Sequence, residues 1–317
     1  MIDPDGIGPD RSTREPYRRV ALTQVPRILG FQDRDAESRT HGCLDRNYWH
    51  YRLIDFSNAR FQEGVHLIAL LYGSEMPGNP WWKRDEVHRW GVAGIRFWEA
   101  QQGRGGFFSE AFPYERSLVG TAFSTVAACE ASRLLNVDIE PRVLRRVGAW
   151  LDRNENMHVA NQMAGAAAAL ACVYRLTNDE RHRTAAGKKV ERLLTLRQPE
   201  GYFSEYGGYD VGYLSINLSY IATYLTVIPD ERLAEAALEA ARFLESKLGA
   251  DCSFDYANTS RKTQYLYPFG LVMLGRSDFV AKHTTGLDSG TVLNPAWMDD
   301  RFSLPLTVDY LRSYLKI

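Results

Sequence analysis

Residues 201–225 read GYFSEYGGYDVGYLSINLSYIATYL, and other parts of the chain repeat the pattern of this stretch. Its first half is rich in glycine and tyrosine, and its second half is an apolar run without charged residues. A helix that is apolar all round is buried in the protein interior. The stretch therefore predicts a loop that leads into a buried helix.

A related stretch, GGFFSEAFPYERSLVGTAFSTVAACEASRLL, begins at Gly105, and a fainter one, CSFDYANTSRKTQYLYPFGLVML, begins at Cys252. The shared FSE at 108–110 and 203–205 gives a separation of about 95 residues. Between these two copies, residues 156–176 have the same order of loop and apolar helix. The period is therefore about half of 95 residues, which is typical of an array of helical hairpins.

The hairpins combine two kinds of helix. Amphipathic helices with one charged face are expected at 83–102, 141–153, 179–198 and 230–248. Nearly uncharged helices are expected at 61–73, 121–135, 164–174, 214–228 and 266–275. This alternation predicts an all-α fold, an incomplete (α/α) toroid of about five helical hairpins, with an open solenoid as the alternative. We expect one toroid domain over residues 21–317, preceded by a flexible arm at 1–20, and a last helix from about Pro305.

Composition limits the function. The net charge of −1 argues against general nucleic-acid binding, which usually requires a basic excess. The four cysteines form no CxxC pair, so we expect neither a metal site nor a disulfide framework, and no cofactor. The N-terminus lacks an apolar signal-peptide core, and no apolar run is long enough to span a membrane. These features predict a cytoplasmic protein.

If the hairpins are in register, the loops that lead into the inner helices form one mouth. The polar residues of these loops are Arg60, Gln62, Tyr114, Glu115, Arg116, Asn161, Gln162, Glu205, Tyr206, Tyr209, Asp210, Tyr213, Arg261, Lys262, Gln264 and Tyr265. Helix N-termini and arginines favour anions, so a ligand with a carboxylate or phosphate group is expected. Glu115 and Asp210 could alternatively be helix caps.

The chain resembles the helical toroid domains of heparinase II/III-like and alginate-lyase-like polysaccharide lyases. The resemblance rests on the repeated glycine-aromatic loops and on DRNYW, PYERS, NQMAGA, EYGGYDVGYLS and SRKTQYLYPFG. The same stretches are similar to a group of proteins encoded with bacterial surface-polysaccharide genes. The resemblance implies proton abstraction from C5 of a uronate, by a lyase or an epimerase, with a saccharide substrate.

The resemblance also implies roles for individual residues. Asn161 or Gln162 would neutralise the carboxylate with help from Arg116 or Arg261, and Tyr209 or Tyr213 would be the base or acid. A tyrosine beside cations is expected to have a lowered pKa. Substrate binding would fall to Arg60, Glu115, Gln162, Glu205, Tyr206, Asp210, Arg261, Lys262 and Tyr265.

The histidine that accompanies the asparagine in alginate-type lyases is replaced here by Gln162. His66 or His158 could substitute for it, although His66 lies in an apolar run typical of a core. Two other functions stay open. One is a terpenoid-type cyclase or prenyl toroid, and the other is a non-catalytic glycan-binding scaffold.

Overall fold

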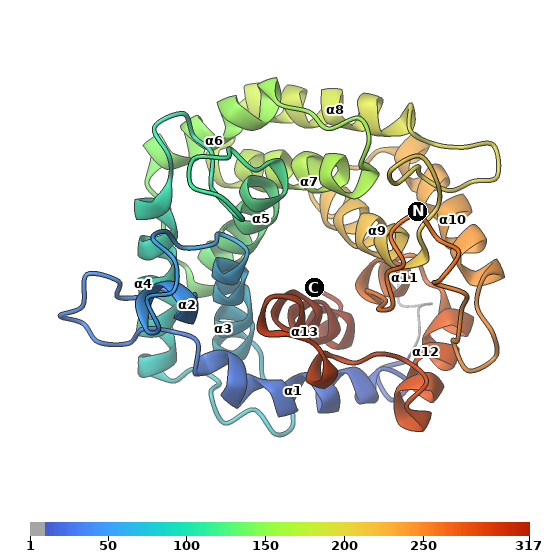
Figure 1. Cartoon of the computed structure of the whole chain (residues 1–317), viewed down its shortest axis with the longest axis horizontal. Coiled ribbons are helices and arrows are strands. Elements are labelled where there is room, and N and C mark those ends of the chain that lie inside the picture. The colour runs from blue at the N-terminus through green and yellow to red at the C-terminus, as the bar shows by residue number, and fades with distance from the viewer. Residues whose placement is uncertain (1–9) are drawn as a thin grey trace.

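The computed structural model describes residues 10–317, and this part of the chain is helical apart from isolated β-bridges. Its helices form two concentric rings (Figure 1). The inner helices are α3 (Gly64–Gly73), α5 (Leu118–Leu135), α7 (Ala160–Thr177), α9 (Val211–Leu225), α11 (Phe269–Met273) and α13 (Asp300–Leu315). The outer helices are α1 (Glu15–Leu29), α4 (Asp85–Gln101), α6 (Pro141–Arg153), α8 (Glu180–Leu194), α10 (Glu231–Ser246) and α12 (Ser277–Ser289). The predicted all-α toroid is confirmed.

The ring is closed by the C-terminal helix. Each inner helix contacts the next one along the chain, and α13 contacts both α11 and α3, as well as the outer helix α1. The described residues therefore hold six inner helices, one more than the five hairpins expected. α13 begins before Pro305, because the Asp299 carboxylate accepts a hydrogen bond from the backbone N–H of Phe302 at 3.0 Å and caps the helix.

Helix α1 corrects the predicted N-terminal arm. Residues 1–9 lie outside the described residues, but the chain is helical from Glu15, so the arm does not extend to residue 20. Tyr17, Ala21, Val25 and Ile28 recur at helical spacing and are fully buried. The polar residues between them concealed this pattern in the sequence.

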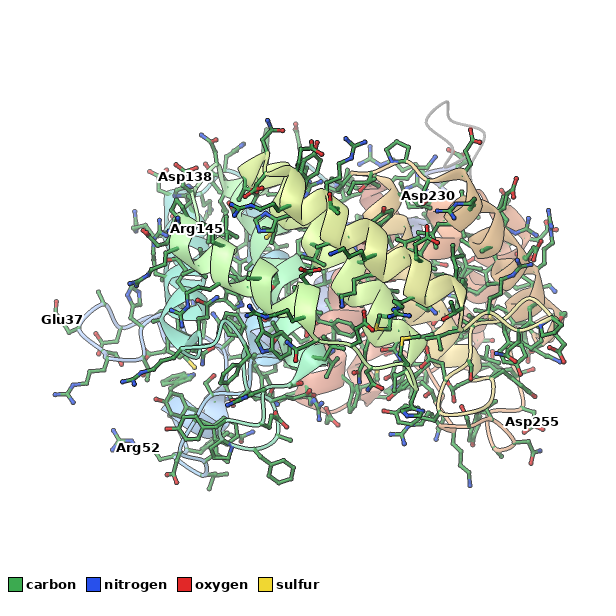
Figure 2. All side chains as sticks on the ribbon, turned by 90° about the horizontal axis from the view of Figure 1, so that it is seen from above. Glu37, Arg52, Asp138, Arg145, Asp230 and Asp255 are labelled. Atoms are coloured by element: carbon green, nitrogen blue, oxygen red, sulfur yellow. The ribbon has the colours of Figure 1, made fainter. Side chains whose placement is uncertain are left out.

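The loops that lead from outer to inner helices lie at one end of the toroid. Figure 2 shows this end with Arg52 and Asp255, whereas Asp138 and Asp230 mark the opposite end with its short connections. All inner helices therefore direct their N-termini towards the loop-rich end, which we call the mouth. This arrangement follows the register that the sequence predicts.

Glycines allow the inner helices to approach closely. A Cβ atom on Gly270 of α11 would lie 2.3 Å from the backbone carbon of Leu218 on α9. Replacement of Gly270 by alanine would thus force two backbones apart, which costs about 1–3 kcal/mol or more. A Cβ atom on Gly187 of the outer helix α8 would meet nothing within 4 Å.

We predict that Gly270→Ala lowers the free energy of unfolding, measured by urea titration, by at least about 1–3 kcal/mol. The matched variant Gly187→Ala should raise it by about 0.5–1 kcal/mol, because alanine favours the helix. Equal urea midpoints for Gly270→Ala and the parent would contradict the described packing of α9 against α11.

The seam between α1, α12 and α13 contains a buried histidine. The ring of His283 lies 5.5 Å from that of Tyr17 and 5.8 Å from that of Tyr310, centroid to centroid. Neither of its ring nitrogens has a hydrogen-bond partner among residues 10–317. Burial lowers the pKa of His283 to about 3, so the folded protein holds this imidazole neutral.

This histidine makes stability depend on pH. Its pKa is ordinarily 6.5, so the unfolded chain binds a proton that the folded chain excludes as the pH falls from 6.5 towards 3. The penalty grows by about 1.4 kcal/mol per pH unit. His283→Leu should therefore unfold at higher urea concentration than the parent at pH 5, and this difference should shrink towards pH 8. A difference that does not vary with pH would contradict a buried neutral imidazole.

Candidate functional site

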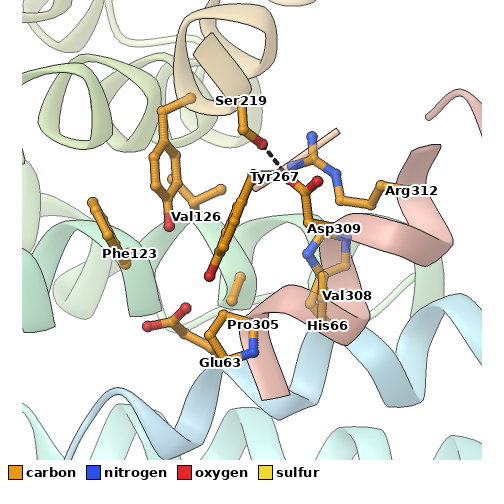
Figure 3. Close-up of a pocket in the computed structure, with 12 residues that line it drawn as sticks. Glu63, His66, Phe123, Val126, Ser219, Tyr267, Pro305, Val308, Asp309 and Arg312 are labelled. Carbon is orange, nitrogen blue, oxygen red and sulfur yellow. Dashed lines mark hydrogen bonds between the residues drawn. The ribbon is translucent and has the colours of Figure 1, made fainter. Parts of the chain in front are cut away.

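The inner helices surround a small cavity on the toroid axis (Figure 3). Its volume is about 30 Å³, and it is lined by Glu63, His66, Phe123, Val126, Ala127, Ser219, Tyr220, Tyr267, Pro305, Val308, Asp309 and Arg312. A space of this size holds about one or two water molecules and no sugar ring. A larger ligand must therefore contact the residues at the mouth above this axial cavity.

Paired charges join three segments at the mouth side of the cavity. Arg60, just before α3, forms an ion pair with Glu63, and its Nη1 lies 4.0 Å from Oε1 of Glu110 in the α4–α5 loop. Glu110 also pairs with Arg301 in the first turn of α13. Burial lowers the pKa of Arg60, but the Glu63 carboxylate and the nearby Tyr220 and Tyr267 together outweigh burial, so the pKa is raised. Arg60, Glu63 and Glu110 are buried, so each of these charges would be unfavourable without its partner.

Further charges lie deeper along the axis. The Asp309 carboxylate accepts hydrogen bonds from the Ser219 hydroxyl and, at 2.9 Å, from the backbone N–H of Phe269. Burial raises its pKa to about 6. Burial also lowers the pKa of His66 to about 3, so this imidazole is neutral at pH 7. His66 thus faces the axial cavity as a neutral group, whereas His158 is exposed at the mouth.

A rim cluster of Arg261, Tyr206 and Tyr213 lies at the mouth. The guanidinium carbon of Arg261 lies 4.4 Å from the Tyr206 ring centroid and 5.9 Å from that of Tyr213. Tyr213 and Tyr220 are about two turns apart on α9 and so share one face of the helix. Tyr220 lines the axial cavity, which places the rim cluster above that cavity.

Burial is the largest influence on the pKa of the Tyr213 phenol. It raises the pKa of Tyr213, and the opposing effect of the Arg261 guanidinium only reduces this rise. The expectation that a neighbouring cation lowers the pKa of this tyrosine is therefore wrong, because desolvation of the phenolate is the larger effect. Tyr213 therefore stays protonated at neutral pH, and its phenol is a weaker acid than an exposed tyrosine.

Asn161, one of the two residues expected to neutralise the sugar carboxylate, forms hydrogen bonds within the protein. Asn161 donates from its backbone N–H at 2.8 Å and from Nδ2 at 3.0 Å to the two oxygens of Glu205. Both side chains are buried, and burial raises the pKa of Glu205 to about 8. Gln162 accepts a hydrogen bond from Asn156 Nδ2 at 3.0 Å. Asn161 and Glu205 therefore join the α8–α9 loop to the N-terminus of α7.

Asp210 has a comparable structural role. Its carboxylate caps α9 by accepting from the backbone N–H of Tyr213 at 2.9 Å. It also accepts from the Thr259 hydroxyl at 2.9 Å and the Arg261 backbone N–H at 3.1 Å. Gln62 is similarly engaged with backbone groups, among them the carbonyl of Gly42 at 2.9 Å. The contacts of Asp210 position the loops that carry the rim cluster, whereas those of Gln62 hold residues 42–44 and helix α4.

Other predicted site residues lie away from the rim cluster. Tyr209 packs against Phe243 of α10, with ring centroids 5.5 Å apart. Arg116 is exposed, and its guanidinium lies over the Phe107 ring at 5.6 Å. The Glu115 carboxylate accepts from the backbone N–H of Ala111 at 2.5 Å.

The last two loop residues of the predicted set lie on the final stretch before α11. Lys262 is exposed, and its backbone N–H donates to the Thr259 hydroxyl at 3.1 Å. Tyr265 is partly buried and packs against Tyr267 and Phe302, with centroid distances of 5.9 and 5.8 Å. Tyr265 thus connects the α10–α11 loop to α13.

Several axial residues were missed in the sequence. They are Glu63, Tyr267, Arg301, Asp309 and Arg312. Most lie on α13, whose inner position has no counterpart in the repeat. Asp309 and Arg312, about one helical turn apart among the mainly apolar residues 304–315, were the available signal.

Four mouth residues have left-handed backbone conformations. They are Tyr114, Arg116, Tyr206 and Lys262, with φ of 61°, 58°, 54° and 56°. Such values are uncommon for bulky residues and are often found at functional sites. The mouth is therefore the end of the toroid where a site is best supported by geometry.

The described residues contain neither a metal-binding cluster nor a membrane-spanning helix. Within residues 10–317, no three His, Cys, Asp or Glu side chains are grouped so that they could hold a metal ion. None of the described helices is long and apolar enough to cross a bilayer.

Comparison with known proteins supports the fold. No protein-family model and no curated protein matches the sequence. The structure is similar to the crystal structure of a sugar epimerase from a ruminal bacterium, with a TM-score of 0.65, 11% identity, and coverage of 94% of this chain and 98% of the other. It is also similar to that of an unsaturated glucuronyl hydrolase specific for heparin, with a TM-score of 0.61, 10% identity, and coverage of 96% and 97%. At these identities the likeness shows the toroid fold alone.

The contact between Arg261 and Tyr213 can be tested through the pKa of Tyr213. Arg261→Gln removes the cation that favours the Tyr213 phenolate, so it should raise the pKa of Tyr213 further. The change can be followed by NMR of protein labelled with ¹³C at the tyrosine Cζ. Arg197→Gln, which removes a cation that pairs with Glu239 on α10, should leave this titration unchanged. An unchanged or lowered pKa of Tyr213 in Arg261→Gln would contradict the described contact.

Proposed function

We propose that this chain acts on an anionic, uronate-containing saccharide at the mouth of the toroid, by proton abstraction at C5, as a lyase or an epimerase of surface-polysaccharide metabolism. The observation that carries the proposal is the rim cluster of Arg261, Tyr206 and Tyr213 above the axial cavity. The two similar structures, a sugar epimerase and a glucuronyl hydrolase, support a saccharide as the substrate.

In this proposal Arg261 binds the sugar carboxylate. A fixed guanidinium stabilises the negative charge that develops when C5 loses its proton. Tyr213, protonated at neutral pH and beside Arg261, donates the proton that the reaction consumes. In elimination this proton goes to the leaving oxygen as its bond to C4 breaks. In epimerisation it goes to the opposite face of C5.

The proton acceptor is proposed to be Glu63. Its carboxylate lines the axial cavity at the mouth end of α3, and burial raises its pKa against the opposing effect of Arg60. A raised pKa makes a carboxylate a stronger base. Because the cavity has room for about one or two waters, Glu63 can accept the C5 proton directly or through water.

Two alternative functions are an isoprenoid cyclase or prenyl-transfer role and a non-catalytic glycan-binding role. An isoprenoid chain requires a large apolar cavity, whereas this cavity measures about 30 Å³ and is lined by Glu63, Asp309 and Arg312. A non-catalytic glycan-binding role would use the same rim cluster without proton transfer. The experiment below distinguishes it from catalysis.

The test is NMR of uronate-containing oligosaccharides incubated with the protein in D₂O, in which exchange removes the C5 proton signal. We expect loss of the C5 proton signal with the parent, and product formation at least about a hundredfold slower with Tyr213→Phe, because the proton donor is lost. Tyr202→Phe removes a hydroxyl from the same loop on the side that faces Phe243, and should exchange at the parental rate.

The products separate the two reactions. An unsaturated sugar identifies a lyase, and an inverted C5 centre identifies an epimerase. Binding without exchange over the whole panel would overturn the catalytic proposal and leave a glycan-binding protein. Product formation at the parental rate in Tyr213→Phe would overturn the role of Tyr213.

A further inference from the structure

A second cleft lies at the mouth end, off the axis, below the α4–α5 loop and beside the C-terminus of α6. We call it the arginine cleft and define it by Arg104, Arg116, Arg153, Phe107, Tyr114 and Trp150. Its volume is about 970 Å³, against about 30 Å³ for the axial cavity. It is thus large enough for a ligand of several sugar rings.

The charge of the cleft is uncompensated. Arg104, Arg116 and Arg153 are all exposed, and none of them forms an ion pair with any other described residue. No aspartate or glutamate lines the cleft. By contrast, Arg133 and Arg175 elsewhere on the molecule share the carboxylate of Glu130. Three free guanidinium groups around one concave surface repel one another and favour an anionic ligand.

Aromatic side chains form the floor and the rim of the cleft. The rings of Phe107 and Trp150 lie 6.4 Å apart, and the Arg116 guanidinium lies 5.6 Å from the Phe107 ring centroid. Tyr114 at the rim is 84% exposed. Aromatic walls with a few polar groups are typical of ligand sites, and aromatic faces pack well against the CH groups of sugars.

The loop above the cleft is held in place. Tyr114 and Arg116 both have left-handed backbone conformations, with φ of 61° and 58°. Between them, the Glu115 carboxylate accepts from backbone N–H groups of its own loop, and the Tyr114 N–H donates to the Ser109 hydroxyl at 3.1 Å. These contacts maintain an unfavourable backbone that presents Tyr114 and Arg116 to the cleft.

An adjoining cleft of about 560 Å³ shares Gly103, Phe107 and Tyr114 with the arginine cleft. Its lining contains one carboxylate, Asp55, and neither lysine nor arginine. A nucleic-acid strand, with a charge on every phosphate, requires cations along its whole path. A saccharide in which charged and neutral rings alternate matches a cationic cleft that continues into an aromatic one without lysine or arginine.

We propose that the arginine cleft is a second binding site, which holds an anionic segment of a saccharide chain without acting on it. The neighbouring neutral rings extend along the adjoining cleft. This site goes beyond the proposed function, because it requires neither turnover nor the rim cluster.

The test is isothermal titration calorimetry of the full chain with hyaluronan oligosaccharides, in which glucuronate alternates with a neutral sugar. We expect Arg104→Gln/Arg153→Gln to weaken binding at one class of sites by about 10- to 100-fold, because two charge-assisted hydrogen bonds are lost. Arg39→Gln/Arg242→Gln removes the same charge from exposed arginines outside the cleft and should leave binding unchanged. Neutral chitin oligosaccharides should bind the parent far more weakly.

Parental affinity in Arg104→Gln/Arg153→Gln, with an unchanged circular dichroism spectrum, would overturn the proposal. Tighter binding of a single-stranded oligonucleotide than of hyaluronan, lost in the same double variant, would overturn the choice of ligand. Arg261→Gln should leave titration of the cleft intact even where C5 exchange is lost. Failure of the proposed catalysis and failure of this site are therefore separate outcomes.

Discussion

The structure depends on burying inner helices that have almost no polar face. α5, α7 and α9 are buried along nearly their whole length, so each of them must be covered on every side. Outer helices cover one side and neighbouring inner helices cover two others. The last open side is removed only when α13 lies against α3 and α11 and closes the ring. Closure therefore satisfies the requirement that the apolar inner helices impose on the whole chain.

Closure also determines what the axis can hold. α13 brings Arg301, Asp309 and Arg312 into a space that is already narrow, and each charge needs a partner there. Glu110 pairs with Arg301, while Asp309 is held by Ser219 and the Phe269 N–H. The axis is thus polar but nearly filled, and the side chains free to meet a ligand lie at the mouth. The two candidate binding regions, the rim cluster and the arginine cleft, both lie at this end.

The sequence predicted the toroid because its strongest signals, the glycine-aromatic loops and the uncharged helices, are local. It also predicted which loops share one end. It did not show that Asn161 is engaged by Glu205 or that Tyr209 packs against Phe243, because both partners come from distant parts of the chain. α1 and α13 were missed or placed only approximately because they carry charges and prolines. The balance between burial and Arg261 that sets the pKa of Tyr213 likewise depends on tertiary packing.

The central claim is that the mouth above the axis binds the carboxylate of a sugar. The most direct measurement is a crystal structure of the protein with a bound hyaluronan oligosaccharide. We predict density for a glucuronate carboxylate within hydrogen-bond distance of the Arg261 guanidinium, with its ring beside Tyr206 and Tyr213. Density confined to the arginine cleft or elsewhere, with the rim cluster empty at saturating ligand, would contradict the claim.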